Sequence, residues 1–346
     1  MGASLDIGVN DAFRTTVERV CRHFSLGDLL GEAIRLRGSF NVNVKIRTTM
    51  GSYVIRFVNS SVREEHLQYV SGLLDALPEE EIPVLRPLQD EQGASIMYDE
   101  GQRIQVTPFV RGRSFQCREQ QVRASAGMLR KFHRLLRDMK PGPVPEWSFY
   151  RSTDYFAETF RHLRSLPAIP AEELSRASYF LERIVQQYDE AEPMLPHSIV
   201  HGDWHFWNQR YLVNDVNCVM DFDFVQHGVR LFDVAYALWV IYLLLPQYAE
   251  TFDAAFLSGY GELTDEEIRA LPAALSRVSL FFLCQAAYAT DPAAKWKRQF
   301  QRQMPFLEWM QGEGGRRVSE LARSASGKSL NCSGDEHGTE GHIGSG

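Results

Sequence analysis

The 346-residue sequence predicts an α+β protein of two lobes, a small β-rich lobe at the N-terminus and a larger helical lobe after it. Three observations lead to this prediction. The region from Gly38 to about Val106 is β-rich and contains one inserted helical stretch. From Glu119 onward, apolar residues recur at helical spacing in several segments. The chain is also long enough for two lobes that each bury a core of their own.

Composition and charge argue against several classes of protein. The net charge of −7 does not suit a protein that neutralises many phosphates of a nucleic acid, so we expect no nucleic-acid partner. Five dispersed cysteines without a CxxC pair predict reduced thiols and a cytoplasmic location, and the N-terminus lacks the pattern of a signal peptide. The longest apolar run, residues 235–245, has 11 residues, so we expect a core helix and no membrane partner.

The elements of the first lobe follow from periodicity and turn residues. A helical pattern runs from the N-terminus to about residue 36 and ends at Gly38. The segments NVNVKIRTT and YVIRFV flank a Met-Gly-Ser turn and predict a β-hairpin. A charged helix follows at about residues 62–77. The segments SIMYD and RIQVTPFV, joined at Glu100-Gly101, predict a second β region.

The second lobe is predicted to be mainly helical. Helical patterns cover residues 119–139, 154–166, 171–191, 232–245, 263–271, 274–289 and 293–311. Thr264 and Glu267 have the spacing of a capping box, and the β-like region at 198–224 interrupts the helices. A Pro/Gly-rich surface connection is expected at 140–147. The last 36 residues hold nine of the 25 glycines, and we expect residues 321–346 to form a disordered tail.

The residues that suggest chemistry lie in the segment HGDWHFWN, from His201 to Asn208, and in VMDFDF, whose Asp221 lies thirteen residues after Asn208. Phosphoryl transfer needs a carboxylate beside the acceptor hydroxyl, to orient it and accept its proton. It also needs oxygen ligands that hold Mg²⁺ against the phosphates. Asp203, Asn208 and Asp221 fit these roles in that order, since a short loop and a returning hairpin can bring all three to one cleft.

The same segments carry a family resemblance. The spacing from His201 through Asp203 and Asn208 to Asp221 is that of the protein-kinase catalytic loop and metal-binding aspartate. Gly202 and the second histidine make it more similar to the aminoglycoside phosphotransferase, choline kinase and homoserine kinase group of small-molecule kinases. Members of that group typically read HGDxHxxN, then a hydrophobic-Asp-aromatic element, then DxA at the start of an apolar helix. This sequence supplies HGDWHFWN, VMDFDF and FDVA.

The resemblance covers about residues 25–290 and implies a bilobal protein-kinase-like fold. It implies that residues 1–106 form the nucleotide-binding lobe, 107–113 the hinge, and 114–320 the helical lobe with the acceptor site. By resemblance Asp203 is the catalytic base, Asn208 and Asp221 bind the metal, and Asp233 is a buried carboxylate that braces the catalytic loop. The implied cofactors are Mg²⁺ and ATP, with GTP as the alternative nucleotide. The implied partner is a small hydroxylated metabolite or antibiotic.

The resemblance also implies nucleotide contacts in the first lobe. The segment from Gly38 to Asn41 resembles the strand–loop–strand that lies over the phosphates, and Arg56 stands where family members usually carry a Lys or Arg that meets them. An acidic partner for Arg56 is expected on the next helix, at Glu64 or Glu65, and helical phase leaves the choice open. The segment TPFVRG resembles the hinge that meets the nucleotide base. The residues expected to bind nucleotide are Ser39, Asn41, Arg56, Glu65, Thr107, Phe109 and Val110.

Several alternatives stay open. His201, Asp203 and His205 form an H-x-D-x-H pattern that could instead bind a transition metal in a phosphohydrolase. Asp223 could be a second metal contact or an exposed loop carboxylate. The arginine at position 56 and the lack of a clear Gly-rich loop also leave open a kinase-like binding or regulatory protein with little catalysis. The sequence does not indicate the acceptor or the oligomeric state.

Overall fold

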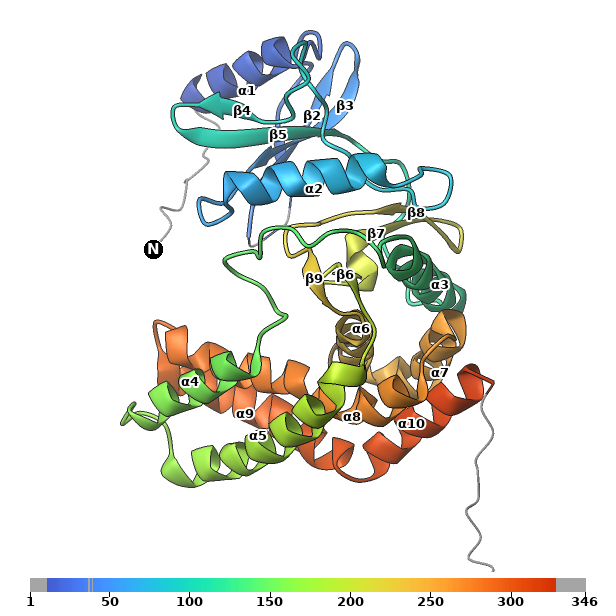
Figure 1. The fold of residues 1–346 in the computed structure, drawn as a ribbon. Helices are drawn as coiled ribbons and strands as arrows, with labels where there is room; N and C mark the ends of the chain where they lie inside the picture. The colour runs from blue at the N-terminus through green and yellow to red at the C-terminus, as the bar shows by residue number, and fades with distance from the viewer. Residues whose placement is uncertain (1–10, 37, 39, 328–346) are drawn as a thin grey trace, which may run out of the picture.

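The computed structural model describes residues 11–36, 38 and 40–327, and it has the two lobes that the sequence predicts (Figure 1). The predicted helical residues 1–10 and the end of the predicted tail, residues 328–346, lie outside the described residues. The N-terminal lobe contains an antiparallel sheet, and helices make up most of the C-terminal lobe.

The sheet of the N-terminal lobe has five strands in the order β1-β2-β3-β5-β4, and every neighbouring pair is antiparallel. Both predicted β regions are confirmed as hairpins, β2–β3 and β4–β5. The strands are β1 (Ile34–Arg35), β2 (Val42–Thr48), β3 (Gly51–Phe57), β4 (Met97–Asp99) and β5 (Gln102–Pro108).

The first helix is shorter than the sequence predicts. Helix α1 (Asp11–His23) packs on the sheet through buried side chains such as Val17 and Val20. It ends because Ser25 and Gly27 adopt positive φ angles of 52° and 79°. The prediction of a helix as far as residue 36 is therefore wrong, and residues 34–35 instead form β1.

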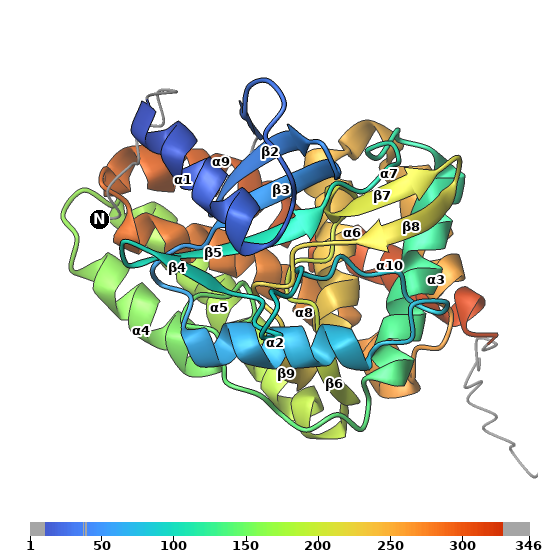
Figure 2. The same ribbon diagram turned by 90° about the horizontal axis from the view of Figure 1, so that it is seen from above.

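Helix α2 (Glu64–Ala76) connects the two lobes (Figures 1 and 2). Its residues Leu73 and Leu74 belong to the same apolar cluster as Val122 and Phe132 of the C-terminal lobe. Val84, in the segment after α2, also forms an isolated bridge to Val219. Because the lobes share this core, the segments on either side of the cleft have a defined mutual position.

The C-terminal lobe is built around buried helices. Helix α3 packs against α7, and α8 contacts α5, α6 and α9. Two short antiparallel pairs, β6–β9 and β7–β8, lie between these helices and the N-terminal lobe (Figure 1). The helices are α3 (Glu119–Leu135), α4 (Thr153–Arg164), α5 (Ala171–Ala191), α6 (Leu231–Leu244), α7 (Ala249–Tyr260), α8 (Asp265–Cys284), α9 (Pro292–Met310) and α10 (Glu313–Ala325). The short strands are β6 (His197–Val200), β7 (Gln209–Leu212), β8 (Asp215–Val219) and β9 (Gln226–Val229).

The helix predictions for this lobe are confirmed except at three places, of which the third, helix α10, is described below. The patterns at 263–271 and 274–289 belong mainly to one helix, α8, which contains Pro272. Its capping box of Thr264 and Glu267 is confirmed. Helix α7 is not among the predicted helices. Its residues Phe252, Phe256 and Tyr260 are buried.

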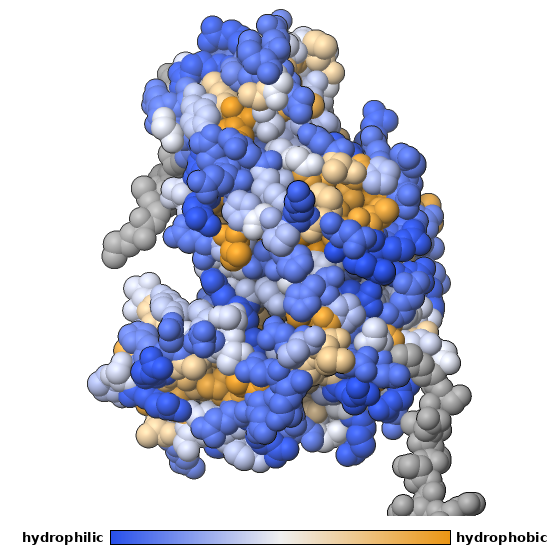
Figure 3. Space-filling model, viewed as in Figure 1, coloured by the Kyte–Doolittle hydropathy of each residue, from blue (hydrophilic) through white to orange (hydrophobic). Residues whose placement is uncertain are grey.

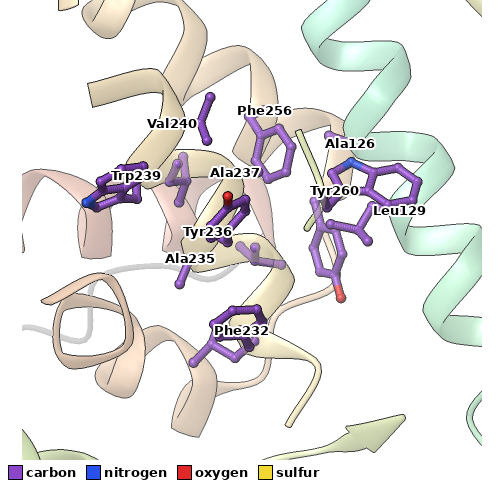
Figure 4. Packing of buried hydrophobic residues seen from close by; sticks show 14 of the residues in the cluster. Ala126, Leu129, Phe232, Ala235, Tyr236, Ala237, Trp239, Val240, Phe256 and Tyr260 are labelled. Atoms are coloured by element: carbon purple, nitrogen blue, oxygen red, sulfur yellow. The ribbon is translucent and has the colours of Figure 1, made fainter. Parts of the chain in front are cut away.

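The apolar run at 235–245 is confirmed as a core helix. Figure 4 shows α6 side chains such as Tyr236 and Val240 beside rings from α7 and aliphatic groups from α3. By length and hydropathy, Asp265–Tyr288 would suffice to cross a membrane, but 83% of that window is buried inside the protein. Helices α6 and α7 pass the same test only as a pair bent by 103°. Such burial is what a core helix of a globular lobe shows.

The predicted start of the tail at residue 321 is wrong. Helix α10 runs to Ala325 and packs on α7 and α8, with Val318 and Ala322 fully buried. Arg317 donates from Nε to Asp253 Oδ2 at 2.8 Å, and the Asp253 carboxylate is fully buried. The high glycine content of the last 36 residues suggested disorder, but a helix needs only one narrow apolar face to pack against its neighbours.

We predict that a chain ending at Gly312 is less stable than one ending at Gly327. The shorter chain exposes the surface that α10 covers and leaves Asp253 without its arginine. Its melting temperature should fall by roughly 5–10 °C. The chain that ends at Gly327 keeps every described contact and serves as the control in a thermal-unfolding measurement. Equal melting temperatures for the two chains would contradict the docking of α10.

Candidate functional site

The segment from His201 to Asn208 is held by a buried carboxylate. Asp233, in the first turn of α6, accepts from His201 N at 2.7 Å and from Gly202 N at 2.9 Å. His133 Nε2 lies 3.0 Å from the same carboxylate, and both of these side chains are fully buried. The bracing role that the resemblance implies for Asp233 is confirmed by these contacts. The loop therefore starts from a fixed point.

Gly202 is required by the geometry of the loop. Its φ angle is +81°, and a Cβ at this position would lie 2.4 Å from the carbonyl oxygen of Phe224. The segment of Phe224 also contains Asp221 and Asp223. The missing side chain lets the two acidic segments approach closely.

His201 is a structural residue. It is fully buried, its Nε2 faces the Met220 carbonyl oxygen at 3.1 Å, and its Nδ1 accepts from Asp203 N at 3.3 Å. Burial lowers the pKa of His201 to about 4, so the ring is neutral at physiological pH. Since both nitrogens have partners, His201 is not available as a metal ligand. Without His201 the H-x-D-x-H pattern lacks one of its three ligands, and the described part of the chain contains no group of three or more His, Cys, Asp or Glu placed to hold a metal ion together.

Asp203 lies at the bottom of the loop with 7% of its surface exposed. Asn208 Nδ2 donates to its Oδ2 at 3.0 Å, whereas Oδ1 is buried and has no hydrogen-bond partner of good geometry among the described residues. Burial raises the pKa of Asp203 to about 7, and interactions with Tyr236 and Asn208 oppose this shift. The site thus holds one carboxylate oxygen fixed and leaves the other for a further partner.

His205 supports the far end of the loop. Its Nδ1 accepts from Asn208 N at 3.2 Å, and its Nε2 lies 3.6 Å from Asp203 Oδ2. Burial lowers the pKa of His205 to about 4. The neutral ring therefore carries its proton on Nε2, on the side of Asp203.

Asn208 and Asp221 are brought together as the sequence predicts. Met220 N donates to the Asn208 carbonyl oxygen at 2.9 Å, which joins the loop to the segment of Asp221. The Asn208 amide nitrogen is bound to Asp203, so its Oδ1 is left for another ligand. Asp221 has a φ angle of +68° and an exposed side chain. Desolvation by the surrounding protein and the charge of Asp223 raise its pKa to about 7.

Arg56 has a different partner from the one predicted. Its Nη2 forms an ion pair with Asp223, whose surface is only 4% exposed. Glu64 and Glu65 lie exposed on α2, and within the described chain neither forms an ion pair with Arg56. The expected arginine–glutamate pair is therefore wrong, because the carboxylate comes across the cleft from the C-terminal lobe. The interpretation of Asp223 as an exposed loop carboxylate is wrong for the same reason.

The other predicted nucleotide contacts lie along the N-terminal lobe. Asn41 is buried and donates to Asp223, so it lies beside Arg56. Thr107 is in β5, and Phe109 follows that strand with Lys45 Nζ 3.9 Å from the centre of its ring. Val110 is half-buried next to it. Ser39 lies outside the described residues.

The aromatic residues of the loop mainly serve packing. Trp204 and Phe206 are fully buried, and Phe206 stacks on Phe115 at 4.7 Å between ring centres. Trp207 is 39% exposed. In Figure 3 the surface is hollowed between the N-terminal lobe and helix α4, on the left of the view.

Two further residues beside the acidic side chains could not be identified from the sequence. Tyr236 appears there only as a core residue of an apolar helix, but its hydroxyl interacts with Asp203. His66 on α2 has Nε2 at 2.8 Å from the Asp223 carbonyl oxygen and Nδ1 at 3.2 Å from the Pro143 carbonyl oxygen. Neither contact has a local sequence signal, since both depend on how distant segments pack.

Comparisons with known proteins find similar sequences over most of the chain. A sequence model described as "Phosphotransferase enzyme family" matches residues 32–271. The homoserine kinase of Zymomonas mobilis is 25% identical over 259 residues, which are 72% of this chain and 78% of that protein. The homoserine kinase of a Bradyrhizobium species is 26% identical over 273 residues, 75% of this chain and 80% of that one.

A solved structure shows the same fold. The microcompartment-associated aminopropanol kinase superposes with a TM-score of 0.66 at 14% sequence identity, over 89% of this chain and 98% of that chain. The fold is therefore the bilobal, protein-kinase-like one that the resemblance implies.

We predict that Gly202→Ala destabilises the protein more than Gly93→Ala does. The two glycines have nearly equal φ angles, +81° and +80°, but a Cβ at Gly93 would have nothing within 4 Å. Gly93→Ala should cost only the backbone strain of about 1–2 kcal/mol. Gly202→Ala adds overpacking against Phe224, for a total of about 2–5 kcal/mol. Urea unfolding measures both, and equal losses would show that the close approach at Gly202 is absent.

Proposed function

The chain belongs to the phosphotransferase enzyme family, and from this premise we propose that it transfers the γ-phosphate of ATP to a hydroxyl group of a small metabolite or antibiotic, in a Mg²⁺-dependent reaction. GTP is the alternative phosphate donor. The four cysteines in the described residues are free thiols, which supports our further proposal of a cytoplasmic location.

The observation that carries the proposal is the state of Asp203. One oxygen of its carboxylate is held by Asn208, and the other is buried and has no hydrogen-bond partner of good geometry among the described residues. An acceptor hydroxyl that donates to Oδ1 would be oriented by it and would pass its proton to the same atom as the phosphate is transferred. The loop is held by Asp233, so the carboxylate is preorganised before an acceptor binds.

The residues around Asp203 suit a magnesium ion. Asn208 Oδ1 and the open carboxylate of Asp221 are hard oxygen donors, which Mg²⁺ prefers, and they lie on segments joined by the Met220–Asn208 hydrogen bond. We propose that these two residues hold the metal. When bound, the ion would supply positive charge against the phosphates of the nucleotide.

The N-terminal lobe supplies the remaining charge. Arg56 keeps a buried Nε that has no partner among the described residues, and we propose that this side of the guanidinium meets the phosphates. Asn41 lies beside it, and we retain Ser39 as a proposed phosphate contact. Thr107, Phe109 and Val110 are proposed to meet the base at the C-terminal end of β5. The exposed position of Glu65 leaves it without support from the structure.

We predict that Asp203→Asn and Asp221→Asn separate the two roles. Asp203→Asn should leave the affinity for Mg·ATP nearly unchanged, while transfer falls by roughly 10²–10⁴-fold, the effect of losing a positioned base. Asp221→Asn should weaken Mg·ATP binding as well as transfer. Calorimetric titration and a transfer assay give the two quantities. An equal loss of binding in both variants would contradict this division of roles.

We further predict substrate-dependent ADP release from one or more members of a panel of small hydroxylated compounds. The relatives named above act on homoserine and aminopropanol, so the panel starts with homoserine and amino-alcohols and extends to amino sugars and antibiotics. Release should be lost in Asp203→Asn. Nucleotide binding without turnover of any compound would instead favour a kinase-like binding protein.

A further inference from the structure

We propose that Asp223 is a positioning residue that holds Arg56 and Asn41 at the nucleotide side of the cleft. Asp223 forms the ion pair with Arg56 that was expected from a glutamate of α2. The inference rests on the proposed function, because it concerns how the same nucleotide site is assembled. It differs from that proposal in assigning the second aspartate of VMDFDF to the N-terminal lobe and not to the metal.

The contacts of Asp223 use both carboxylate oxygens. Oδ1 is paired with Arg56 Nη2, and Oδ2 accepts from Asn41 Nδ2 at 2.5 Å. With only 4% of its surface exposed, Asp223 has both oxygens directed to the N-terminal lobe. Asp221, two residues earlier, is exposed in contrast. The two aspartates therefore face different partners.

The neighbours of Asp223 fix its position. His66 on α2 reaches its carbonyl oxygen, with Nε2 at 2.8 Å. The Phe40 ring packs against the Phe224 ring at 5.2 Å between centres. These contacts bring the segment after Gly38 and helix α2 to the same two residues of the C-terminal lobe.

The contacts of Asn41 extend this arrangement to the end of β3. Asn59 N donates to Asn41 Oδ1 at 3.0 Å, and Asn59 Nδ2 donates to the Phe40 carbonyl oxygen at 3.0 Å. Asn41 is therefore held on both sides, by Asp223 through its amide nitrogen and by the backbone after β3 through its oxygen. Movement of Asp223 would affect the whole segment.

The position of Asp223 affects nucleotide binding through the orientation of the Arg56 guanidinium. Arg56 is attracted by both Asp223 and Asp221. While Asp223 holds Nη2, the guanidinium keeps a defined orientation and its Nε stays without a partner among the described residues. Without Asp223, the arginine would be drawn to Asp221 and would no longer present the same atoms to a phosphate.

A double-mutant cycle tests the proposal with Arg56→Met, Asp223→Asn and the double variant. Mg·ATP affinity is measured by calorimetry, and the free energy of unfolding is measured in urea. Asp223→Asn should weaken Mg·ATP binding roughly ten- to a hundredfold in the native background, the range of coupling between contacting residues. In the Arg56→Met background the loss should be smaller, because only the contact of Asp223 with Asn41 remains, and the Mg²⁺ requirement should be unchanged. Asp215→Asn, an exposed carboxylate in β8, is the matched control and should leave both measurements unchanged.

Each of the other possible results of this experiment contradicts a specific part of the proposal. A loss in Asp223→Asn that persists in the Arg56→Met background, with a raised Mg²⁺ requirement, would make Asp223 a metal ligand. A Glu65→Gln variant that couples to Arg56 more strongly than Asp223→Asn would restore the glutamate of α2 as the partner. Additive unfolding free energies would show that the ion pair does not form. If the native protein binds no Mg·ATP while the unfolding energies are still coupled, the proposed function fails and the contact stands.

Discussion

The arrangement of the whole site depends on one buried carboxylate. Asp233 binds two successive backbone N–H groups at the start of the loop from His201 to Asn208 and also contacts His133 of α3. His133 in turn contacts the hydroxyl of Tyr260 at the end of α7. A buried carboxylate without these partners would be strongly destabilising. The same contacts that stabilise Asp233 therefore hold α3, α6 and α7 together and fix the position from which Asp203 projects.

Three further aspartates lie close together, and their partners keep them distinct. Asp203 is held by Asn208, Asp223 is neutralised by Arg56, and Asp221 stays open to the cleft. Desolvation and the charges of Asp223 and Asp203 raise the pKa of Asp221, while Arg56 opposes that shift. The positive charge of Arg56 offsets part of the repulsion among these three carboxylates, and a bound metal ion would do the same. The charge state of the aspartates in the C-terminal lobe therefore depends on an arginine of the N-terminal lobe.

The parts that the sequence could predict are those with local signals. Asp203 and Asn208 lie five residues apart on one loop, and the hairpins β2–β3 and β4–β5 have clear alternation. The partner of Arg56 could not be predicted, because Asp223 is 167 residues away and only the packing of the lobes brings it near. Helix α10 was missed because its docking needs few apolar residues, such as Val318 and Ala322. In physical terms, local periodicity determines elements, whereas tertiary packing determines which charges meet.

The connection at residues 140–147 shows how far tertiary packing departs from composition. Its Pro/Gly content predicts a surface segment, but Trp147 at its end packs against Phe40 of the N-terminal lobe and Phe224 beside the acidic cluster. Pro143 accepts from His66 through its carbonyl oxygen if that nitrogen carries the proton. The connection therefore contacts both lobes at the point where Asp223 joins them. A segment that is fixed to both sides of the cleft in this way limits how the lobes can move apart, so the cleft is bounded by three parts of the chain that only the folded structure brings together.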